Sequence, residues 1–125
     1  MNEEARAAEL IHKMLRKKLY VLISTPLEPP EQLKPLLATH LDYMIGLEQR
    51  GLLFASGPLT EADAPPSGQG LTILRVKDAA EARRIAEAEP FFAQGLRTFE
   101  LKEWTVMEGT LGVRVNLSDQ SVEVA

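Results

Sequence analysis

The amino-acid sequence predicts an α+β fold of the ferredoxin-like type, a split βαβ arrangement with an antiparallel sheet. One observation behind this prediction is the length of 125 residues, which suits a single domain. A second is the composition, 45% hydrophobic and 26% charged, which is typical of a folded globular chain. The third is the order of the elements, because hydrophobic periodicity indicates strand–helix–strand twice in succession with short connections.

A helical extension is expected before the two strand–helix–strand units. Acidic residues lie early and basic residues late in the segment 3–17, an order that the helix dipole favours. We therefore divide the chain into an N-terminal helical extension, residues 1–17, and an α+β domain, residues 18–125. The alternation of apolar and polar residues over 110–118 predicts an additional strand near the C-terminal end of this domain.

The first strand–helix–strand unit begins with a short apolar run that is rich in β-forming residues, 19–23. An apolar residue, among them Leu37 and Leu41, then recurs every three or four positions, which predicts an amphipathic helix over residues 30–50. Gly51 is a typical signal for the end of a helix. Residues 52–55 are predicted to form the second strand.

The second unit follows a long loop, 61–70, that is rich in Pro, Gly and Ala; a loop of this length in a small domain is often functional. Residues 71–76 are predicted to form a strand. Asp78 is suited to cap the next helix, because a glutamate follows three residues later. That helix is expected to end at Glu89, since Pro90 disfavours the α conformation in the residue before it.

The last strand of the sheet, residues 96–107, changes its apolar face along its length. Phe99 and Leu101 point to one face, whereas Trp104 and Val106 bring apolar side chains to the other. Two helices cover only one face of a split βαβ sheet. A second copy of the chain is the economical cover for the other face, so we expect a homodimer, or a larger assembly built from it.

Two titratable residues occupy positions on apolar helix faces. His40 lies on the apolar stripe of the first long helix, and Glu89 closes the apolar stripe of the second. Burial of such groups costs free energy unless they are paired, and pairs of this kind concentrate at functional sites. Without further information, a histidine on an apolar face is more often a core residue whose hydrogen bonds are satisfied.

The sequence resembles the YCII-related (YciI-like) family in two motifs. The first is G-L-L-x-A-x-G-P, here Gly51–Pro58, which follows a helix that carries His40. The second is an acidic residue followed by P-F/Y-x-x-x-G, here Glu89–Gly95. The resemblance covers roughly Lys18 to Val106, and the two motifs occur in the order and spacing that are typical of the family.

This resemblance implies a dimeric α+β barrel, in which two ferredoxin-like domains associate, with a pocket where a histidine faces an acidic residue. The usual acid of the family is aspartate, whereas this chain has Glu89, whose side chain is longer by one methylene group. Among proteins of this family and fold, one is implicated in the dehydrochlorination of a chlorinated hydroquinone, and another is muconolactone isomerase. The resemblance therefore implies proton transfer on small cyclic or enolic compounds.

The candidate catalytic residues are His40 as the base and Glu89 as the residue that orients it. An imidazole accepts and donates protons near neutral pH, and a carboxylate on its other nitrogen selects the tautomer and stabilises the charged form. A metal site is not expected, because one His and one Glu are too few ligands and His12 would have to fold over the pocket. We expect no cofactor.

A small-molecule ligand is expected to meet aromatic walls and the G-P turn of the first motif. The aromatic candidates lie within the two motifs or on the last strand, and they are Phe54, Phe91, Phe92 and Trp104. Polar contacts are expected from Ser56, Gly57 and Pro58, which follow the second strand and where glycine allows close approach to the backbone. The same aromatic residues also suit a hydrophobic core or a dimer interface.

Three functions remain open at this point. The leading hypothesis is a cofactor-independent enzyme of lyase or isomerase type that acts on a small cyclic or enolic compound. The second is a non-catalytic dimer that binds a small ligand or serves as an accessory subunit. The third is a purely structural dimerisation domain.

Overall fold

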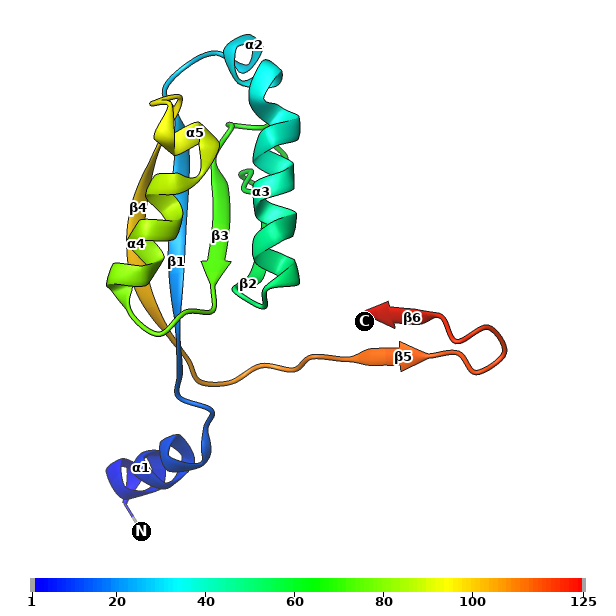
Figure 1. Ribbon diagram of the computed structural model, residues 1–125. Coiled ribbons are helices and arrows are strands. Elements are labelled where there is room, and N and C mark those ends of the chain that lie inside the picture. The colour runs from blue at the N-terminus through cyan, green and yellow to red at the C-terminus, as the bar shows by residue number, and fades with distance from the viewer. Residues whose placement is uncertain (1, 125) are drawn as a thin grey trace. The chain divides into compact units, whose positions relative to one another are not determined.

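The computed structural model describes residues 2–124, which divide into two compact units (Figure 1). One unit is Lys18–Thr105. The other joins the segment that ends at Lys17 to the segment that begins at Val106. Residues 106–124 belong to this second unit, and the two strands of the C-terminal segment pair with each other in a separate sheet.

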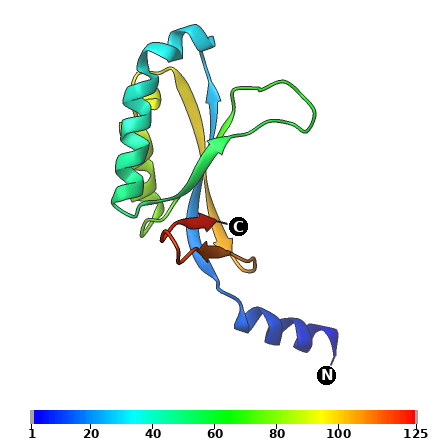
Figure 2. The same cartoon turned by 90° about the vertical axis from the view of Figure 1, so that its right-hand side faces the viewer.

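The unit Lys18–Thr105 has a ferredoxin-like α+β fold, as predicted. Its four-stranded antiparallel sheet has the order β2-β3-β1-β4, the arrangement that two interleaved strand–helix–strand units produce. The long helices lie on one face of this sheet, and the loop between β2 and β3 extends away from them (Figure 2). The strands are β1 (Lys17–Pro26), β2 (Leu53–Pro58), β3 (Gly70–Leu74) and β4 (Arg97–Val106).

The first helical region consists of three pieces, so the prediction of one continuous helix over residues 30–50 was wrong in its first part. The pieces are α2 (Pro30–Leu33), the 3-10 helix η1 (Lys34–Leu36) and α3 (Leu37–Gln49). Pro35 lacks the N–H group that would continue α2, and this explains the break. The predicted end at the glycine is confirmed, since the residue after the last turn, Gly51, has a φ of 75°.

The second helical region follows the predicted local signals. In α4 (Ala79–Ala88), the Asp78 side chain accepts a hydrogen bond from the Glu81 N–H at 2.8 Å. Glu89 has an extended backbone, and the short helix α5 (Pro90–Ala93) begins directly after it. The prediction that α4 ends at Glu89 is therefore confirmed, because the residue before a proline disfavours the α conformation.

The hydrophobic core lies between the sheet and helices α3 and α4. Phe99 and Leu101 of β4 pack against it, which confirms the predicted orientation of that part of the strand. Leu37 and Leu41 are about half exposed, so the predicted apolar stripe of α3 reaches the core only in its last turns. The buried residues of the core are Tyr20, Leu22, Met44, Leu47, Leu74, Ala82 and Ala86.

The other unit contains a helix and a β-hairpin. Helix α1 (Glu3–Lys13) ends earlier than the predicted residue 17, because Met14 is extended and Arg16 has a φ of 53°. Strands β5 (Val113–Val115) and β6 (Val122–Val124) pair antiparallel. The strand predicted over 110–118 is thus shorter than expected and pairs with the C-terminal segment. None of the helices in residues 2–124 is long and apolar enough to cross a membrane.

Candidate functional site

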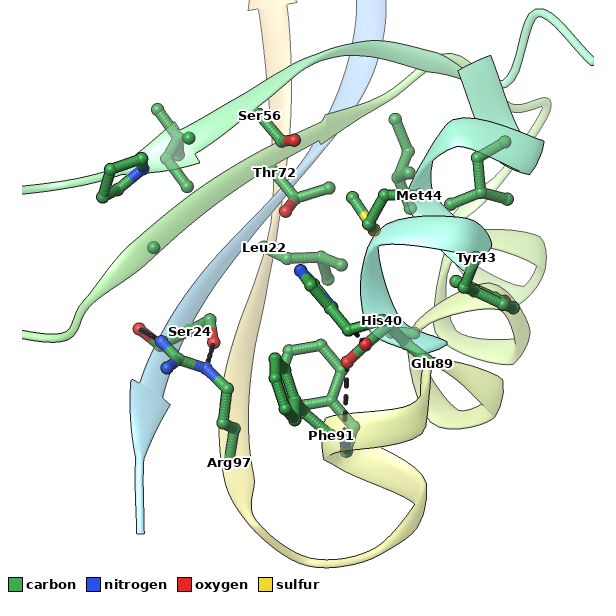
Figure 3. Close-up of a pocket in the computed structure, with 18 of the residues that line it drawn as sticks. Leu22, Ser24, His40, Tyr43, Met44, Ser56, Thr72, Glu89, Phe91 and Arg97 are labelled. Atoms are coloured by element: carbon green, nitrogen blue, oxygen red, sulfur yellow. Dashed lines mark hydrogen bonds and ion pairs between the residues drawn. The ribbon is translucent and has the colours of Figure 1, made fainter. Parts of the chain in front are cut away.

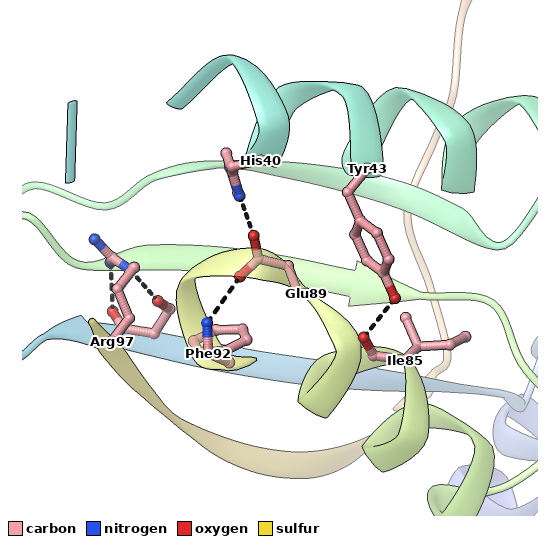
Figure 4. A network of polar contacts seen from close by, with 7 residues as sticks. His40, Tyr43, Ile85, Glu89, Phe92 and Arg97 are labelled. Carbon is pink, nitrogen blue, oxygen red and sulfur yellow. Dashed lines mark hydrogen bonds and ion pairs between the residues drawn. The ribbon is translucent and has the colours of Figure 1, made fainter. Parts of the chain in front are cut away.

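His40 and Glu89 meet across the gap between α3 and α5. The Nδ1 atom of His40 lies 2.5 Å from Oε1 of Glu89 (Figure 4). An ionised carboxylate only accepts hydrogen bonds, so the imidazole donates to it through an Nδ1–H group in the corresponding tautomer. The two residues are 49 positions apart in the sequence, and the packing of α3 beside α5 brings them together.

Glu89 is held at a buried position, with 4% of its surface exposed. Its second oxygen, Oε2, accepts a hydrogen bond from the Phe92 N–H at 3.4 Å, so the carboxylate also caps α5. A buried carboxylate without partners would be costly, and here both oxygens have a partner. The Glu-Pro sequence produces this arrangement, since the extended backbone of Glu89 lets its side chain turn back over the first turn of α5.

The imidazole of His40 is held by a stacking contact on its face in addition to the contact of Nδ1 with Glu89. It stacks on the ring of Phe91 with the centroids 4.5 Å apart and the planes at 24°. Its other nitrogen, Nε2, points away from Glu89 into a cavity (Figure 3). The arrangement leaves one ring nitrogen free for contact with a ligand, while the other is held by the carboxylate.

The cavity has a volume of about 350 Å³ and lies between α3, α5 and the helix-facing side of the sheet. Its size suits a small molecule. Seven of the predicted site residues line it, and they are His40, Ser56, Gly57, Pro58, Glu89, Phe91 and Phe92. Leu22, Leu41 and Thr72 are among the other residues of its wall.

Phe54 and Trp104 do not line this cavity, so the structure does not bring these two of the expected aromatic residues to it. Phe54 is 45% exposed, and its ring lies 5.4 Å from the guanidinium carbon of Arg75. A register shift between Leu53 and Ala55 directs Phe54 away from the cavity. Trp104 is 40% exposed, and its position on β4 alternates with the residues that face the core.

Ser56, Gly57 and Pro58 form the cavity edge on β2. Ser56 lies opposite Thr72 in the antiparallel pairing with β3. No atom lies within 4 Å of the place that a Cβ on Gly57 would take. A ligand atom therefore has room to approach the backbone at this point.

Arg97, which the sequence analysis did not single out, also lines the cavity. Its Nε donates to the Ser24 hydroxyl at 2.6 Å, and its Nη2 donates to the backbone oxygens of Ser24 and Gly68 at 3.3 and 2.5 Å (Figure 3). A signal was present in the sequence. Arg97, Phe99 and Leu101 are two positions apart on β4, so their side chains point to the same face of the sheet, the one that the helices cover.

Burial and charge change the ionisation of two residues around the pair. Burial lowers the pKa of the Arg97 guanidinium, and the negative charge of Glu89 opposes that change. Burial also raises the pKa of the Tyr43 hydroxyl, with the charge of Glu89 acting in the same direction. Tyr43 donates a hydrogen bond to the backbone oxygen of Ile85 at 2.7 Å, which ties α3 to α4.

Within residues 2–124, no three His, Asp or Glu side chains are grouped in a way that holds a metal ion. His12 lies on α1 and is exposed. An imidazole in the position of His40 can accept or donate a proton near neutral pH.

Comparison with known proteins supports the fold and establishes the family. The structure is similar to that of 5-chloro-2-hydroxyhydroquinone dehydrochlorinase from Burkholderia phenoliruptrix AC1100, solved in complex with 2,5-dihydroxybenzoquinone. The TM-score is 0.56 and the sequence identity 20%, over 69% of this chain and 93% of the other. No curated protein matches the chain significantly in sequence. The model of the YCII-related domain matches residues 18–105, and the chain therefore belongs to the YCII-related family.

Proposed function

We propose that this protein is a small-molecule enzyme of lyase or isomerase type that works without a cofactor. The observation that carries the proposal is the contact of 2.5 Å between His40 Nδ1 and Glu89 Oε1 at the wall of a cavity. The contact leaves Nε2 of the imidazole as an acceptor for a substrate proton. Glu89 is the positioning residue, since it selects the tautomer and stabilises the imidazolium that forms.

The proposed step begins with the transfer of a proton from a substrate carbon to Nε2 of His40. The electron pair of the broken C–H bond moves into an adjacent carbonyl group and forms an enolate. In an isomerase, the same proton returns to another atom of the substrate. In a lyase, the electron pair of the enolate expels a leaving group with its bonding electrons, and the proton leaves His40 for water.

A small cyclic or enolic compound is the proposed substrate. The cavity volume of about 350 Å³ limits the size of the ligand. Phe91 and Phe92 supply apolar surface suited to a flat ring. The dehydrochlorinase of similar fold, whose complex contains 2,5-dihydroxybenzoquinone, suggests hydroxylated and quinone-like rings as the first compounds to examine.

We further propose that the protein is a homodimer, located in the cytoplasm. Within the unit Lys18–Thr105, α3 and α4 lie on the same face of the sheet (Figure 2). Ile23 follows Leu22, which packs in the core, so its side chain lies on the opposite face of the sheet, where a second copy would cover it. The absence of cysteine among the 125 residues fits a reducing compartment.

Two assays test the proposal. The first uses NMR in D₂O to follow the exchange of ring hydrogens of hydroxylated benzoquinones. The second measures the release of chloride from 5-chloro-2-hydroxyhydroquinone. We expect wild-type protein to accelerate exchange or release. His40→Gln should lose about 10²- to 10⁴-fold of that rate, the usual contribution of a general base. Glu89→Gln should lose less, because it removes the charge but leaves an acceptor for Nδ1.

The matched control is His12→Gln, which removes the other histidine of the chain at an exposed position on α1. Its rates should equal those of the wild type. If these compounds bind and raise the melting temperature, yet no variant alters their chemistry, a binding role without catalysis is correct. If none of them protects the protein from heating or reacts, the proposed substrate class is wrong.

A further inference from the structure

The guanidinium of Arg97 is held in one orientation at the cavity wall. Three oxygen atoms of Ser24 and Gly68 accept hydrogen bonds from its Nε and Nη2 atoms. Ser24 is itself buried, with 6% of its surface exposed, so the side chain is anchored to the sheet interior. An arginine in a fixed orientation presents its remaining donors in a defined direction.

One nitrogen of Arg97 remains available in this arrangement. Within residues 2–124, Nη1 makes no hydrogen bond to the protein, although it carries two N–H groups. The same residues contain no buried side-chain nitrogen or oxygen without a partner. Nη1 is therefore accessible, and Arg97 is one of the residues that line the cavity.

The positive charge of Arg97 also has no direct counter-ion in the described part of the chain. None of the ion pairs formed by residues 2–124 includes Arg97. Glu89 is close enough for its charge to act on Arg97, but its two oxygens accept hydrogen bonds from His40 and Phe92. A half-buried cation with carbonyl and hydroxyl partners only is a suitable site for an anionic oxygen.

We infer that Arg97 binds an oxyanion of the substrate, so that the ligand of this cavity is a small ring or enolic compound with an ionised oxygen. The inference rests on the proposed function, since it names the substrate class of the same site. The oxygen held by Arg97 is an enolate, a phenolate or a carboxylate. In the proposed proton transfer, the electron pair of the C–H bond moves toward an oxygen that faces the guanidinium, while the proton goes to His40.

Binding measurements with matched anionic and neutral probes test this inference. One pair is 2,5-dihydroxybenzoquinone, ionised at neutral pH, and its neutral dimethyl ether. The other pair is benzoate and benzamide, which places the charge on a carboxylate. By isothermal titration, we expect wild-type protein to bind the anion of at least one pair roughly tenfold more tightly than its neutral partner, as a hydrogen bond to a charged group predicts. The pair that shows the preference identifies the kind of oxyanion.

Arg97→Met removes the charge and retains most of the side-chain length. This variant should bind the anion and its neutral partner with about equal affinity. If the methionine variant does not fold, Arg97→Gln is the second variant. Its polar side chain can still form a hydrogen bond to Ser24. Arg75→Met is the matched control, because Arg75 lies over Phe54 outside the cavity. It should keep the wild-type preference.

The inference is overturned if the wild type binds neither anion more tightly than its neutral partner, or binds none of the probes at millimolar concentration. It is also overturned if the preference persists without Arg97. His40→Gln separates this result from the proposed function, because that variant should lose proton exchange and still prefer the anion. If proton exchange depends on His40 but Arg97 makes no difference to the preference for the anion, this inference is refuted and the proposed function stands.

Discussion

His40 and Phe91 stack face to face, with ring centroids 4.5 Å apart and an interplanar angle of 24°. The stacking fixes the plane of the imidazole, and the contact with Glu89 fixes its rotation within that plane. Phe91 is buried and follows the Glu-Pro pair directly, so one short segment supplies both contacts. The orientation of the proposed base thus depends on the turn between α4 and α5.

The tautomer of His40 follows from this geometry. We expect neutral His40 to carry its proton on Nδ1, because Glu89 Oε1 accepts a hydrogen bond there. Glu89→Met removes the acceptor at similar side-chain length, and the ring should then adopt the mixture of tautomers that an exposed histidine shows. ¹⁵N NMR of the imidazole measures this, and exposed His12 is the internal control. Identical His40 spectra in the two proteins would contradict the pairing.

Tyr43→Phe should lower the free energy of unfolding by about 0.5–1.5 kcal/mol near neutral pH, because the hydroxyl donates to the Ile85 backbone oxygen. Burial raises the pKa of this hydroxyl in the folded state above its ordinary value of 10.0, although the charge of Arg50 opposes the change. The unfolded state therefore loses the proton first as the pH rises. The contribution of Tyr43 is complete below about pH 10 and is lost as the pH rises through the higher pKa of the folded state.

Urea unfolding at a series of pH values measures that effect. The difference between wild type and Tyr43→Phe should shrink above about pH 10. Phe99→Leu is the control, since it changes a residue packed against the core without removing a titrating group. Its difference from the wild type should not depend on the ionisation of Tyr43. A Tyr43 difference that stays constant through the alkaline range would show that its hydroxyl ionises equally in both states.

Gly68→Ala should lower the free energy of unfolding, because it strains the end of the loop between β2 and β3. Gly68 has a φ of 84°, and a Cβ there would lie 2.9 Å from Cγ of Pro26. Alanine at a positive φ costs more than about 1 kcal/mol, and the contact with the proline ring adds to that. Gly57→Ala is the matched control, because its Cβ would meet no atom within 4 Å. Equal changes of the two urea midpoints would refute this account of Gly68.

The proposed dimer predicts a defined effect of charge on the sheet face opposite the helices. Wild-type protein should sediment as a dimer at micromolar concentration. Ile23→Lys places a charge where the second copy would pack and should produce a folded monomer. Leu37→Lys is the control, because Leu37 is an exposed leucine on α3, on the helix-covered side. A monomeric wild type at this concentration would exclude the dimer.

Much of the fold follows from signals that act within a few residues. Asp78 and Glu81 are three positions apart and mark the start of α4, and the Glu89–Pro90 pair ends it. These features depend on backbone conformation close to the residue itself, so the sequence predicts them without knowledge of the rest of the chain. Pro35 acts just as locally, and its effect on the first helix was accessible by the same reasoning.

The sequence by itself determined the order of strands and helices and the positions of His40 and Glu89 on faces that turn inward. Only the tertiary structure decided which atoms meet. It placed Nδ1 of His40 on one oxygen of Glu89, moved Phe54 away from the cavity through a register shift, and brought Arg97 to Ser24, 73 positions earlier in the chain. The reason is that periodicity assigns a side chain to a face, whereas contacts between distant residues depend on strand register and on the packing of helices against the sheet.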